Sequence, residues 1–363
     1  MTSPAPAAVG GEPTDAGPAC ARLLITGPGQ VELLQQRLPP LGEHDVYART
    51  VISGVSHGTE MAWLQGSAAS LHRCWDPQRR FYSHGRGRDY PVAPGYESIA
   101  RVTVTGSAVT SVRAGDLIAV DAPHATGHLL TEQTAAVGLL PEGTDPQRAV
   151  FHILARVALG GVHDARPQVG DTLVVMGLGT VGLLAIQQAR HAGALVIGVD
   201  RYPLRVQAAH ALGVSAIHSH DGLDVAAAVH DLTDGVGADA AIEASGSYRG
   251  LHEAIRCLRV GGRVATVASY HGDQAGLRLG EEYHRNRITL ISSMTINGCD
   301  QRTHPLWTLD RLNQTAQRLI AEDVVRVDGL ITHRIPFDHA AEAYALITDT
   351  PQDTIKVVLT YDT

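Results

Sequence analysis

The sequence predicts an α/β protein in which an N-terminal unit of short strands precedes a doubly wound parallel-sheet domain. Two observations carry this prediction. Before about residue 140, strand-like runs follow one another and are separated by Gly, Pro and Asp, which is typical of an all-β barrel or sandwich-like unit. After residue 170, apolar runs alternate with helical patterns, the order that βαβ units and a parallel sheet produce.

Length and composition limit the classes of protein to which the chain can belong. The 363 residues suit two domains, and the net charge of −8 argues against non-specific binding of nucleic acid or anionic membranes. Apolar runs are too short for a membrane span, and residues 1–20 read as a disordered leader rather than a secretory signal. Four widely spaced cysteines make a disulfide framework improbable. We therefore expect a cytoplasmic protein.

The N-terminal unit is predicted over residues 21–160. A stretch without periodicity, Gly66 to Pro94, is rich in Arg, His and aromatic residues and is interpreted as a long surface excursion. A helix of small and apolar residues, Ala149–Ala165, closes the unit. The strands expected before it are Arg22–Thr26, Asp45–Ile52, Ile99–Val104 and Asp116–Val120.

The parallel-sheet domain is predicted over residues 161–298, and residues 299–363 are expected to return to the first domain. Expected strands are Thr172–Met176, Ala194–Val199, Ala216–His218, Ala238–Glu243, Arg263–Val267 and Ile288–Met294. Expected helices are Gly182–Ala192, Pro203–Leu212, Leu223–Leu232 and Tyr248–Leu258. The C-terminal part is predicted to contain helix Trp307–Glu322, strand Leu330–Thr332, helix Phe337–Ile347 and strand Ile355–Leu359.

The glycine-rich turn between the first strand and helix predicts a dinucleotide site. Gly177 permits a tight turn, Gly179 lets the backbone approach a pyrophosphate, and Gly182 lets the helix pack close to the sheet. Asp200 ends the second strand, where a carboxylate accepts hydrogen bonds from the adenosine ribose and disfavours a 2′-phosphate. We therefore expect NAD as the cofactor.

Arg201 and Arg205, which follow Asp200, keep NADP open as the less favoured cofactor. Asp200 could instead cap the helix that begins near Pro203. The residues predicted to bind the cofactor are Gly177, Leu178, Gly179, Thr180, Val181, Gly182, Asp200, Arg201, Arg205, Ser245 and Val267.

In this order, the motifs of the chain resemble those of the medium-chain dehydrogenase/reductase superfamily. They are Gly54-Val-Ser-His-Gly-Thr-Glu60, Pro94-Gly-Tyr-Glu97, Val112-Arg-Ala-Gly-Asp116, Gly177-Leu-Gly-Thr-Val-Gly182, Glu243-Ala-Ser-Gly246, Gly261-Gly-Arg-Val264 and Leu330-Ile-Thr-His-Arg334. The resemblance implies a GroES-like β-barrel catalytic domain beside a Rossmann domain. The first two motifs look closest to a zinc-free branch that resembles bacteriochlorophyllide a dehydrogenase-like proteins.

The departures from the family pattern concern zinc. Zinc-dependent members carry metal ligands at the positions that align here with Ser56, Tyr96 and Arg156. A hydroxyl and a neutral phenol do not replace thiolate and imidazole as zinc ligands, and an arginine repels the cation. The stretch after Val120 has no cysteine-rich lobe. The resemblance therefore implies an enzyme without either zinc site.

Without a metal, side chains must stabilise the reacting oxygen and move its proton. By resemblance, Tyr96 faces the reacting carbon, and Arg156 could supply the positive charge that a tyrosine base needs; the alternative is a buried tyrosine bonded to backbone. His57 could bind pyrophosphate, relay protons or cap a turn, and Ser56 or Thr59 could replace the family's hydroxyl relay. Glu97 is expected to hold Arg156 or a backbone amide.

Three aromatic or imidazole side chains, Trp63, His84 and Trp307, are predicted substrate contacts. The other histidines of the N-terminal part, including His124 and His152, are expected to be solvated or singly bonded rather than metal ligands.

The leading hypothesis is a metal-independent, NAD-dependent oxidoreductase. It would interconvert a secondary alcohol and a ketone on a polar small molecule, in sugar, cyclitol or other specialised metabolism. The alternatives are an NADPH-dependent enone or quinone reductase and a dinucleotide-binding protein without turnover. Because Ile288–Met294 reads as an edge strand, a homodimer or a dimer of dimers is expected.

Overall fold

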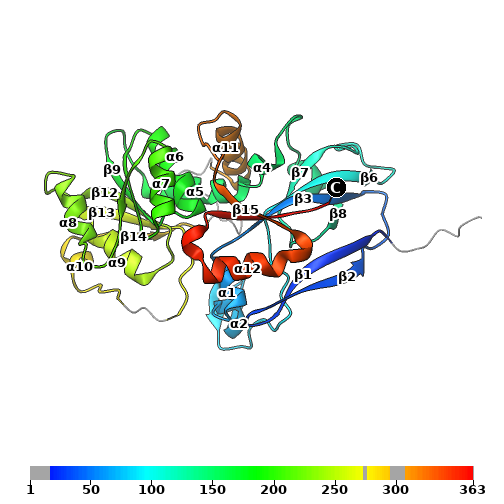
Figure 1. Ribbon diagram of the computed structural model, residues 1–363, viewed down its shortest axis with the longest axis horizontal. Helices are drawn as coiled ribbons and strands as arrows, with labels where there is room; N and C mark the ends of the chain where they lie inside the picture. The colour runs from blue at the N-terminus through cyan, green and yellow to red at the C-terminus, as the bar shows by residue number, and fades with distance from the viewer. Residues whose placement is uncertain (1–16, 273–275, 295–306, 363) are drawn as a thin grey trace, which may run out of the picture.

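The computed structural model describes residues 17–272, 276–294 and 307–362. Figure 1 shows a parallel-sheet domain at one end of the molecule and a strand-rich domain at the other. Helices α5 (His152–Ala165) and α11 (Leu309–Ala321) pack against each other where the two domains meet. The predicted α/β class, with a Rossmann domain and a separate N-terminal β domain, is confirmed.

The Rossmann sheet has six parallel strands in the order β11-β10-β9-β12-β13-β14. This order places the first strand beside the fourth, and ligands bind outside the carboxyl ends of such strands at this reversal. The strands are β9 (Thr172–Met176), β10 (Leu195–Asp200), β11 (Ser215–His218), β12 (Ala238–Glu243), β13 (Leu258–Thr266) and β14 (Thr289–Ser292). The helices are α6 (Thr180–His191), α7 (Pro203–Ala211), α8 (Val225–Asp231), α9 (Tyr248–Arg256) and α10 (Glu282–Arg285).

Both faces of this sheet are covered, as a parallel sheet requires. Along β9, Leu173 and Val175 point into the core that contains α5 and α6, whereas Val174 and Met176 point into the core under α9. Because both faces are buried, the residues of β9 after Thr172 are all apolar. The run Thr172–Met176 forms the predicted strand because every side chain after Thr172 is buried.

The strand-rich domain is built around β3 (Asp45–Val55). In the second sheet the order is β15-β16-β3-β6-β7, and β8 also pairs with β3. The C-terminal segment thus joins this sheet, because β16 pairs antiparallel with β3. The remaining elements are β1 (Ala19–Gly27), β2 (Gln30–Arg37), β6 (Ser98–Thr105), β7 (Leu117–Val120), β8 (Gly127–Thr131), β15 (Ile331–Pro336), β16 (Lys356–Thr360), α1 (Thr59–Leu64), α3 (Glu132–Val137), η1 (Phe337–His339), α12 (Ala340–Asp349) and η2 (Pro351–Asp353).

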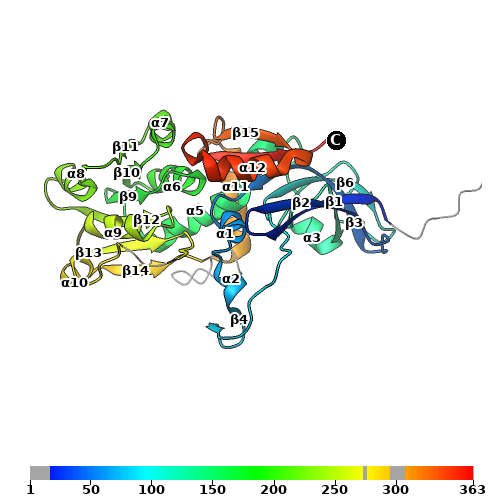
Figure 2. The same ribbon diagram turned by 60° about the horizontal axis from the view of Figure 1, so that its bottom comes forward.

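The expected excursion, residues 66–94, projects from this domain beside α1 (Figure 2). It contains α2 (Ala69–His72) and the short pair β4 (Cys74–Asp76) and β5 (Phe81–Ser83), and most of its side chains are exposed. Its composition identified it because it has too few apolar side chains to form a core.

Two expected boundaries differ from the structure. The helix predicted from Ala149 is split into α4 (Pro146–Ala149), which Asp145 caps by accepting the Gln147 N–H, and α5. Strand β1 begins at Ala19, so the last residues of the predicted leader belong to a strand. Residues 1–16 of that leader and the predicted 298/299 domain boundary lie outside the described residues. Within the described part, no helix combines the length and apolarity that a bilayer span requires.

Candidate functional site

The glycine-rich turn has the geometry of a phosphate cradle. Gly177 has φ +93°, and a Cβ on it would lie 2.7 Å from Ser245 N. A Cβ on Gly182 would collide with the Gly177 carbonyl oxygen. Helix α6 starts at Thr180 with Gly179 as its N-cap, and no described side chain caps it. Its first N–H groups and dipole are therefore available to an anion.

The side chains of the turn serve packing. Leu178 is fully buried, Val181 packs against the same core, and the Thr180 hydroxyl donates to the Ile355 carbonyl at 2.7 Å. This last bond ties the cradle to the residue just before β16. Any contact of Leu178 or Thr180 with a cofactor therefore runs through the backbone, whereas the Val181 side chain is only partly buried.

Asp200 lies at the end of β10, as predicted, and fixes the turn. Its carboxylate accepts the Leu178 N–H at 2.7 Å and the Tyr202 N–H at 2.8 Å. The side chain is almost completely buried and its Oδ2 lies 3.8 Å from Arg205 Nη1. The carboxylate therefore holds the glycine turn in place at the position where an adenosine ribose would lie.

The two arginines after Asp200 differ in their surroundings. Arg201 is exposed, with its guanidinium 4.7 Å from the Tyr202 ring centroid. Arg205 donates to Thr354 O at 3.1 Å and Pro351 O at 3.0 Å, and it lies beside Gly179. These contacts hold the charge of Arg205 beside the phosphate cradle.

Ser245 and Val267 follow β12 and β13 at the same edge of the sheet. The Ser245 N–H donates to Glu243 Oε1 at 2.8 Å, and its hydroxyl donates to the same oxygen. Tyr270 donates to Glu243 Oε2 at 2.5 Å. Val267 packs against Gly161 of α5 so closely that a Cβ there would overlap it. Ser245 thus borders the cradle at Gly177, whereas Val267 packs against α5.

Ser56 and Tyr96 contact each other in the strand-rich domain, beside the ends of β3 and β6. Ser56 directly follows β3, Tyr96 lies just before β6, and the Tyr96 phenol donates to Ser56 Oγ at 2.6 Å. Burial, together with Glu97 and Glu60, raises the pKa of Tyr96 well above its ordinary value. Burial therefore favours the neutral form of the Tyr96 phenol, and a role for Tyr96 as a base stays a prediction.

A buried network that we did not predict positions Ser56. The Glu60 carboxylate accepts the Ser56 N–H at 2.8 Å, lies 3.1 Å from His124 Nε2 and accepts the Tyr344 hydroxyl. His124 Nδ1 lies 2.7 Å from Ser53 Oγ. Glu60, His124 and Ser53 are each 0% exposed. The expectation of a solvated or singly bonded His124 is thus wrong, because both ring nitrogens have partners.

Arg156 enters the site from α5. It is 2% exposed, and Nη1 donates to Asn313 Oδ1 of α11 at 2.8 Å. Nη2 lies 3.8 Å from Asp121 Oδ2, and His152 Nε2 lies 3.7 Å from Asp121 Oδ1. Arg156 is close enough to Tyr96 for the two side chains to interact electrostatically, so the predicted cation is present beside the phenol.

Glu97 pairs with Lys356, which corrects the expectation that it holds Arg156 or a backbone amide. Lys356 is the only lysine in the chain, and its Nζ lies 2.6 Å from Glu97 Oε2, with both residues 0% exposed. Nζ also donates to Val55 O at 3.5 Å. A Cβ on Gly54 would overlap the ammonium group, so the pair needs a glycine there.

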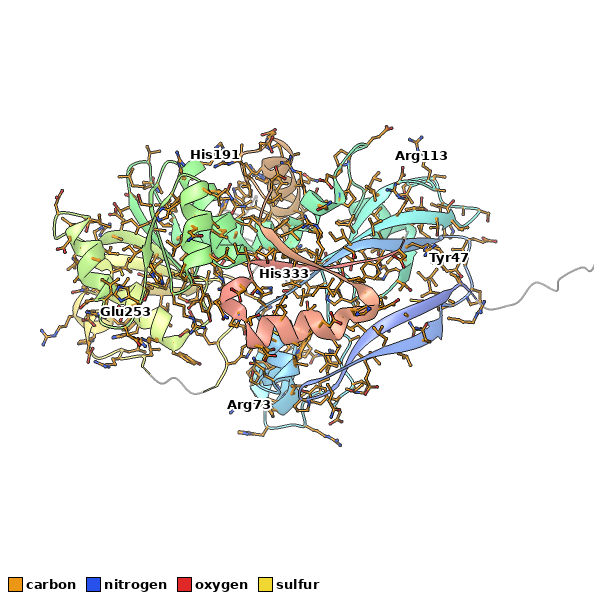
Figure 3. All side chains as sticks on the ribbon, viewed as in Figure 1. Tyr47, Arg73, Arg113, His191, Glu253 and His333 are labelled. Carbon is orange, nitrogen blue, oxygen red and sulfur yellow. The ribbon has the colours of Figure 1, made fainter. Side chains whose placement is uncertain are left out.

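His57 lies among basic groups. Burial lowers its pKa to about 3, helped by Lys356, Arg205 and His333. His333 lies on β15, near the middle of the molecule (Figure 3). His57 Nε2 is buried without a hydrogen-bond partner among the described residues. A neutral imidazole and three basic neighbours suit the approach of a diphosphate, which favours the first of the three roles predicted for His57.

The predicted substrate contacts are dispersed. Trp63 packs on the core beneath β1 and donates to Ser70 Oγ at 3.3 Å. His84 is exposed in the excursion. Trp307 contacts the His163 ring at a centroid distance of 4.2 Å, about two helical turns along α5 from Arg156. The structure brings none of the three together with Tyr96.

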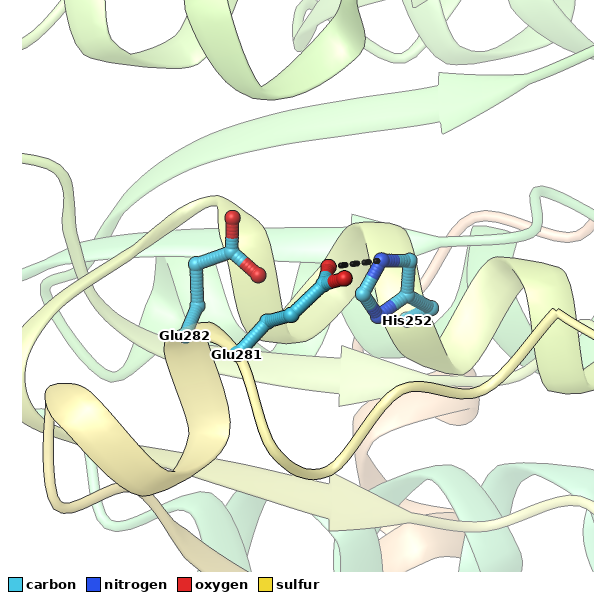
Figure 4. A group of neighbouring side chains, drawn as sticks. All are labelled: His252, Glu281 and Glu282. Atoms are coloured by element: carbon cyan, nitrogen blue, oxygen red, sulfur yellow. Dashed lines mark ion pairs between the residues drawn. The ribbon is translucent and has the colours of Figure 1, made fainter.

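The residues at the family's metal positions form a poor zinc set: a hydroxyl bonded to a phenol, and a guanidinium. Elsewhere in the described residues, one group has ligand-like spacing, His252, Glu281 and Glu282 (Figure 4). Its carboxylates already have cationic partners, since Glu281 lies 3.4 Å from Arg278 and Glu282 lies 3.8 Å from Arg256. This cluster is an ion-pair network on the Rossmann domain.

The buried pair predicts a large stability effect. Lys356→Met leaves the Glu97 carboxylate buried and uncompensated, so the unfolding free energy should fall by about 3–5 kcal/mol in urea denaturation. The double variant Glu97→Gln/Lys356→Met, which removes both charges, should recover most of that loss. A single variant that is no less stable than the double variant would contradict the pairing.

Comparisons with known proteins agree with this geometry. Residues 180–310 match the family described as zinc-binding dehydrogenase. The D-guloside 3-dehydrogenase of Escherichia coli K12 is 28% identical over 94% of this chain and 99% of its own length. The NADP-dependent isopropanol dehydrogenase of Clostridium beijerinckii is 31% identical over 61% of this chain and 62% of its own.

Among solved structures, the alcohol dehydrogenase rspB of Escherichia coli CFT073 superposes with a TM-score of 0.72 at 18% identity, over 95% of this chain and 100% of its own. This likeness shows the fold. Together with the glycine cradle, the strand order and the two relatives, it agrees with the motifs found in the sequence. Together these findings support the medium-chain dehydrogenase/reductase superfamily as the family of this chain.

Proposed function

We propose that the protein is a metal-independent, NAD-dependent oxidoreductase that interconverts a secondary alcohol and a ketone on a polar metabolite. The observation that carries this proposal is the hydrogen bond of 2.6 Å between Tyr96 and Ser56. These hydroxyls occupy positions where zinc-dependent relatives bind their metal, and they lie on the catalytic side of the phosphate cradle. Hydroxyl donors can stabilise an oxygen that a metal would otherwise polarise.

The hydroxyls of Thr59, Tyr96 and Ser56 form a chain of hydrogen bonds in which each donates to the next. Tyr96 donates to Ser56, and a hydrogen bond from Thr59 also acts on the Tyr96 phenol. Thr59 is exposed. Ser56 then has its own proton to donate to a carbonyl oxygen. In ketone reduction, Ser56 gives its proton to the oxygen and is reprotonated through Tyr96 and Thr59 from water. In alcohol oxidation the same protons return.

The nicotinamide supplies the chemistry of hydride transfer to or from the carbon. The residues that would hold it are the α6 N-terminus for the diphosphate and Asp200 for the ribose. The Glu60 network keeps Ser56 fixed while the cofactor and substrate bind, and Arg156 provides positive charge beside the developing alkoxide. Each of these side chains acts by binding or orientation, which transition-state stabilisation requires.

The position of Asp200 supports NAD over NADP. Its two oxygens already accept backbone N–H groups, and each retains a lone pair for a ribose hydroxyl. A 2′-phosphate there would face a buried carboxylate. The rspB structure contains NADH, whereas the isopropanol dehydrogenase relative uses NADP. In this chain, Asp200 is the residue that favours NAD.

A sugar or another polyhydroxylated compound is the proposed kind of substrate, in keeping with the D-guloside dehydrogenase relative. We also expect a homodimer or a dimer of dimers. The edge strand β14 supports this, because Leu290 and Met294 at that edge are exposed large apolar side chains.

Removing the phenol tests the proton path. Tyr96→Phe should reduce kcat by ~10²-fold or more while NADH affinity stays close to that of the wild type. Steady-state rates with a panel of polyols and keto-sugars, and NADH fluorescence titration, give the two readouts. Tyr90→Phe, which loses a hydroxyl bonded to backbone outside the site, is the matched control. A near-normal kcat for Tyr96→Phe would remove the phenol from the mechanism.

Changing the ribose carboxylate tests cofactor choice. Asp200→Ala should weaken NADH binding by about 10- to 100-fold, the loss expected for hydrogen bonds to a charged acceptor. NADPH binding should weaken much less, because the repulsion of its phosphate is removed at the same time. Fluorescence titration of both dinucleotides measures the difference. Equal losses for both would show that Asp200 only supports the glycine turn.

A further inference from the structure

The N-terminal half of α5 carries buried nitrogen atoms that the proposed mechanism leaves incompletely used. We propose that Arg156 and His152 form a carboxylate subsite, so that the substrate is a hydroxy acid or the corresponding oxo acid. This inference deepens the proposed function and rests on it. The subsite lies beside Tyr96 and is distinct from the phosphate cradle.

Arg156 has donors without acceptors. Its guanidinium is 98% buried, since only 2% of the residue is exposed, and Nη1 is used by Asn313. Nε and Nη2 are buried and have no hydrogen-bond partner among the described residues. A buried donor without an acceptor is unfavourable, and the cost is larger for charged groups. The two free N–H groups of an arginine fork match the two oxygens of a carboxylate.

In its imidazolium form, His152 adds a second donor on the same side, because Nδ1–H is already used by the Ala149 carbonyl. It lies one helical turn before Arg156 on α5, so both side chains share one helix face. Its Nδ1 lies 3.0 Å from Ala149 O, which leaves Nε2 buried and without a hydrogen-bond partner in the described part of the chain. Buried, unpartnered nitrogens of two residues therefore face the same small region.

Asp121 marks the place where the carboxylate would bind. Its oxygens lie 3.7 Å from His152 Nε2 and 3.8 Å from Arg156 Nη2, which is outside hydrogen-bond range. The Asp121 side chain is 56% exposed. It therefore occupies the open side of the subsite as a weakly held internal anion, which a substrate carboxylate can displace toward solvent.

The subsite is close to the reacting groups. Strands β6 and β7 pair with Ser98 opposite Val120, so the residues before Ser98 and after Val120 lie at one end of the ladder. These residues include Tyr96 and Asp121. A substrate whose hydroxyl bonds Ser56 can thus place a carboxylate against Arg156, and the same molecule must carry both groups.

Matched pairs of probes test the inference on the full-length, NADH-loaded protein. D-gluconate, L-lactate and 3-hydroxybutyrate are compared with sorbitol, 1,2-propanediol and 1,3-butanediol, which lack the carboxylate. Isothermal titration calorimetry gives the affinities without turnover. At least one acid should bind ~10-fold or more tightly than its neutral counterpart, as charge-assisted hydrogen bonds predict.

Three variants assign the effect. Arg156→Met should abolish the preference for the acid, whereas Asp121→Asn should increase acid affinity by removing the internal competitor. Arg259→Met, which removes a half-exposed arginine of the Rossmann domain, should change neither. If Arg156→Met does not fold, the exposed Asp121→Asn variant decides alone, because unchanged or weaker acid binding there overturns the inference.

The remaining outcomes are also decisive. No preference for any acid, a preference that survives Arg156→Met, or tighter binding of inorganic phosphate than of all three acids overturns the carboxylate subsite. Failure of the proposed function looks different: NADH does not bind, or neither member of any pair is turned over. Acid binding that depends on Arg156 without turnover would keep the subsite and reject the reaction.

Discussion

The buried ion pair between Lys356 and Glu97 is the interaction on which the catalytic side of this molecule depends. It joins the C-terminal strand β16 to the start of β6, and Lys356 also bonds the last residue of β3. Ser56 and Tyr96 are the immediate neighbours of these strand ends. Two fully desolvated charges hold this geometry only while both are present, because either one alone would be buried without compensation. The C-terminal segment therefore fixes the ends of β3 and β6, next to Ser56 and Tyr96.

A second constraint comes from the hydrogen bonds that fix Ser56. Glu60 receives the Ser56 N–H, and its other oxygen is shared by His124 and Tyr344. In a zinc site the cation sets the positions of its ligands; here buried acceptors and donors set the positions of the hydroxyls. The same physical requirement, a preorganised polar group aimed at the reacting oxygen, can be met in either way. The hydrogen bond from the Thr180 hydroxyl to Ile355 O connects the strand-rich domain to the phosphate cradle.

The Rossmann half was largely predictable because its signals are local. Thr172–Met176 and Ala238–Glu243 were predicted with the observed bounds, since apolar runs between helical patterns specify buried parallel strands. The catalytic half was less predictable. Ser56, Tyr96 and Arg156 were found through the family pattern, but Lys356 lies 259 residues from its partner Glu97 and Tyr344 lies 284 from Glu60. The spacing of apolar residues within helices and strands does not predict contacts between residues so far apart in the sequence. One signal was present: a single lysine in a chain rich in arginine, followed by apolar residues in a strand.

The central claim is that side chains, rather than a bound cation, stabilise the reacting oxygen. The most direct test is elemental analysis of the purified protein, combined with turnover in the presence of a strong zinc chelator. We expect no stoichiometric zinc and unchanged turnover after chelation. About one zinc per chain, bound at Ser56 and Tyr96 and lost together with activity, would contradict it.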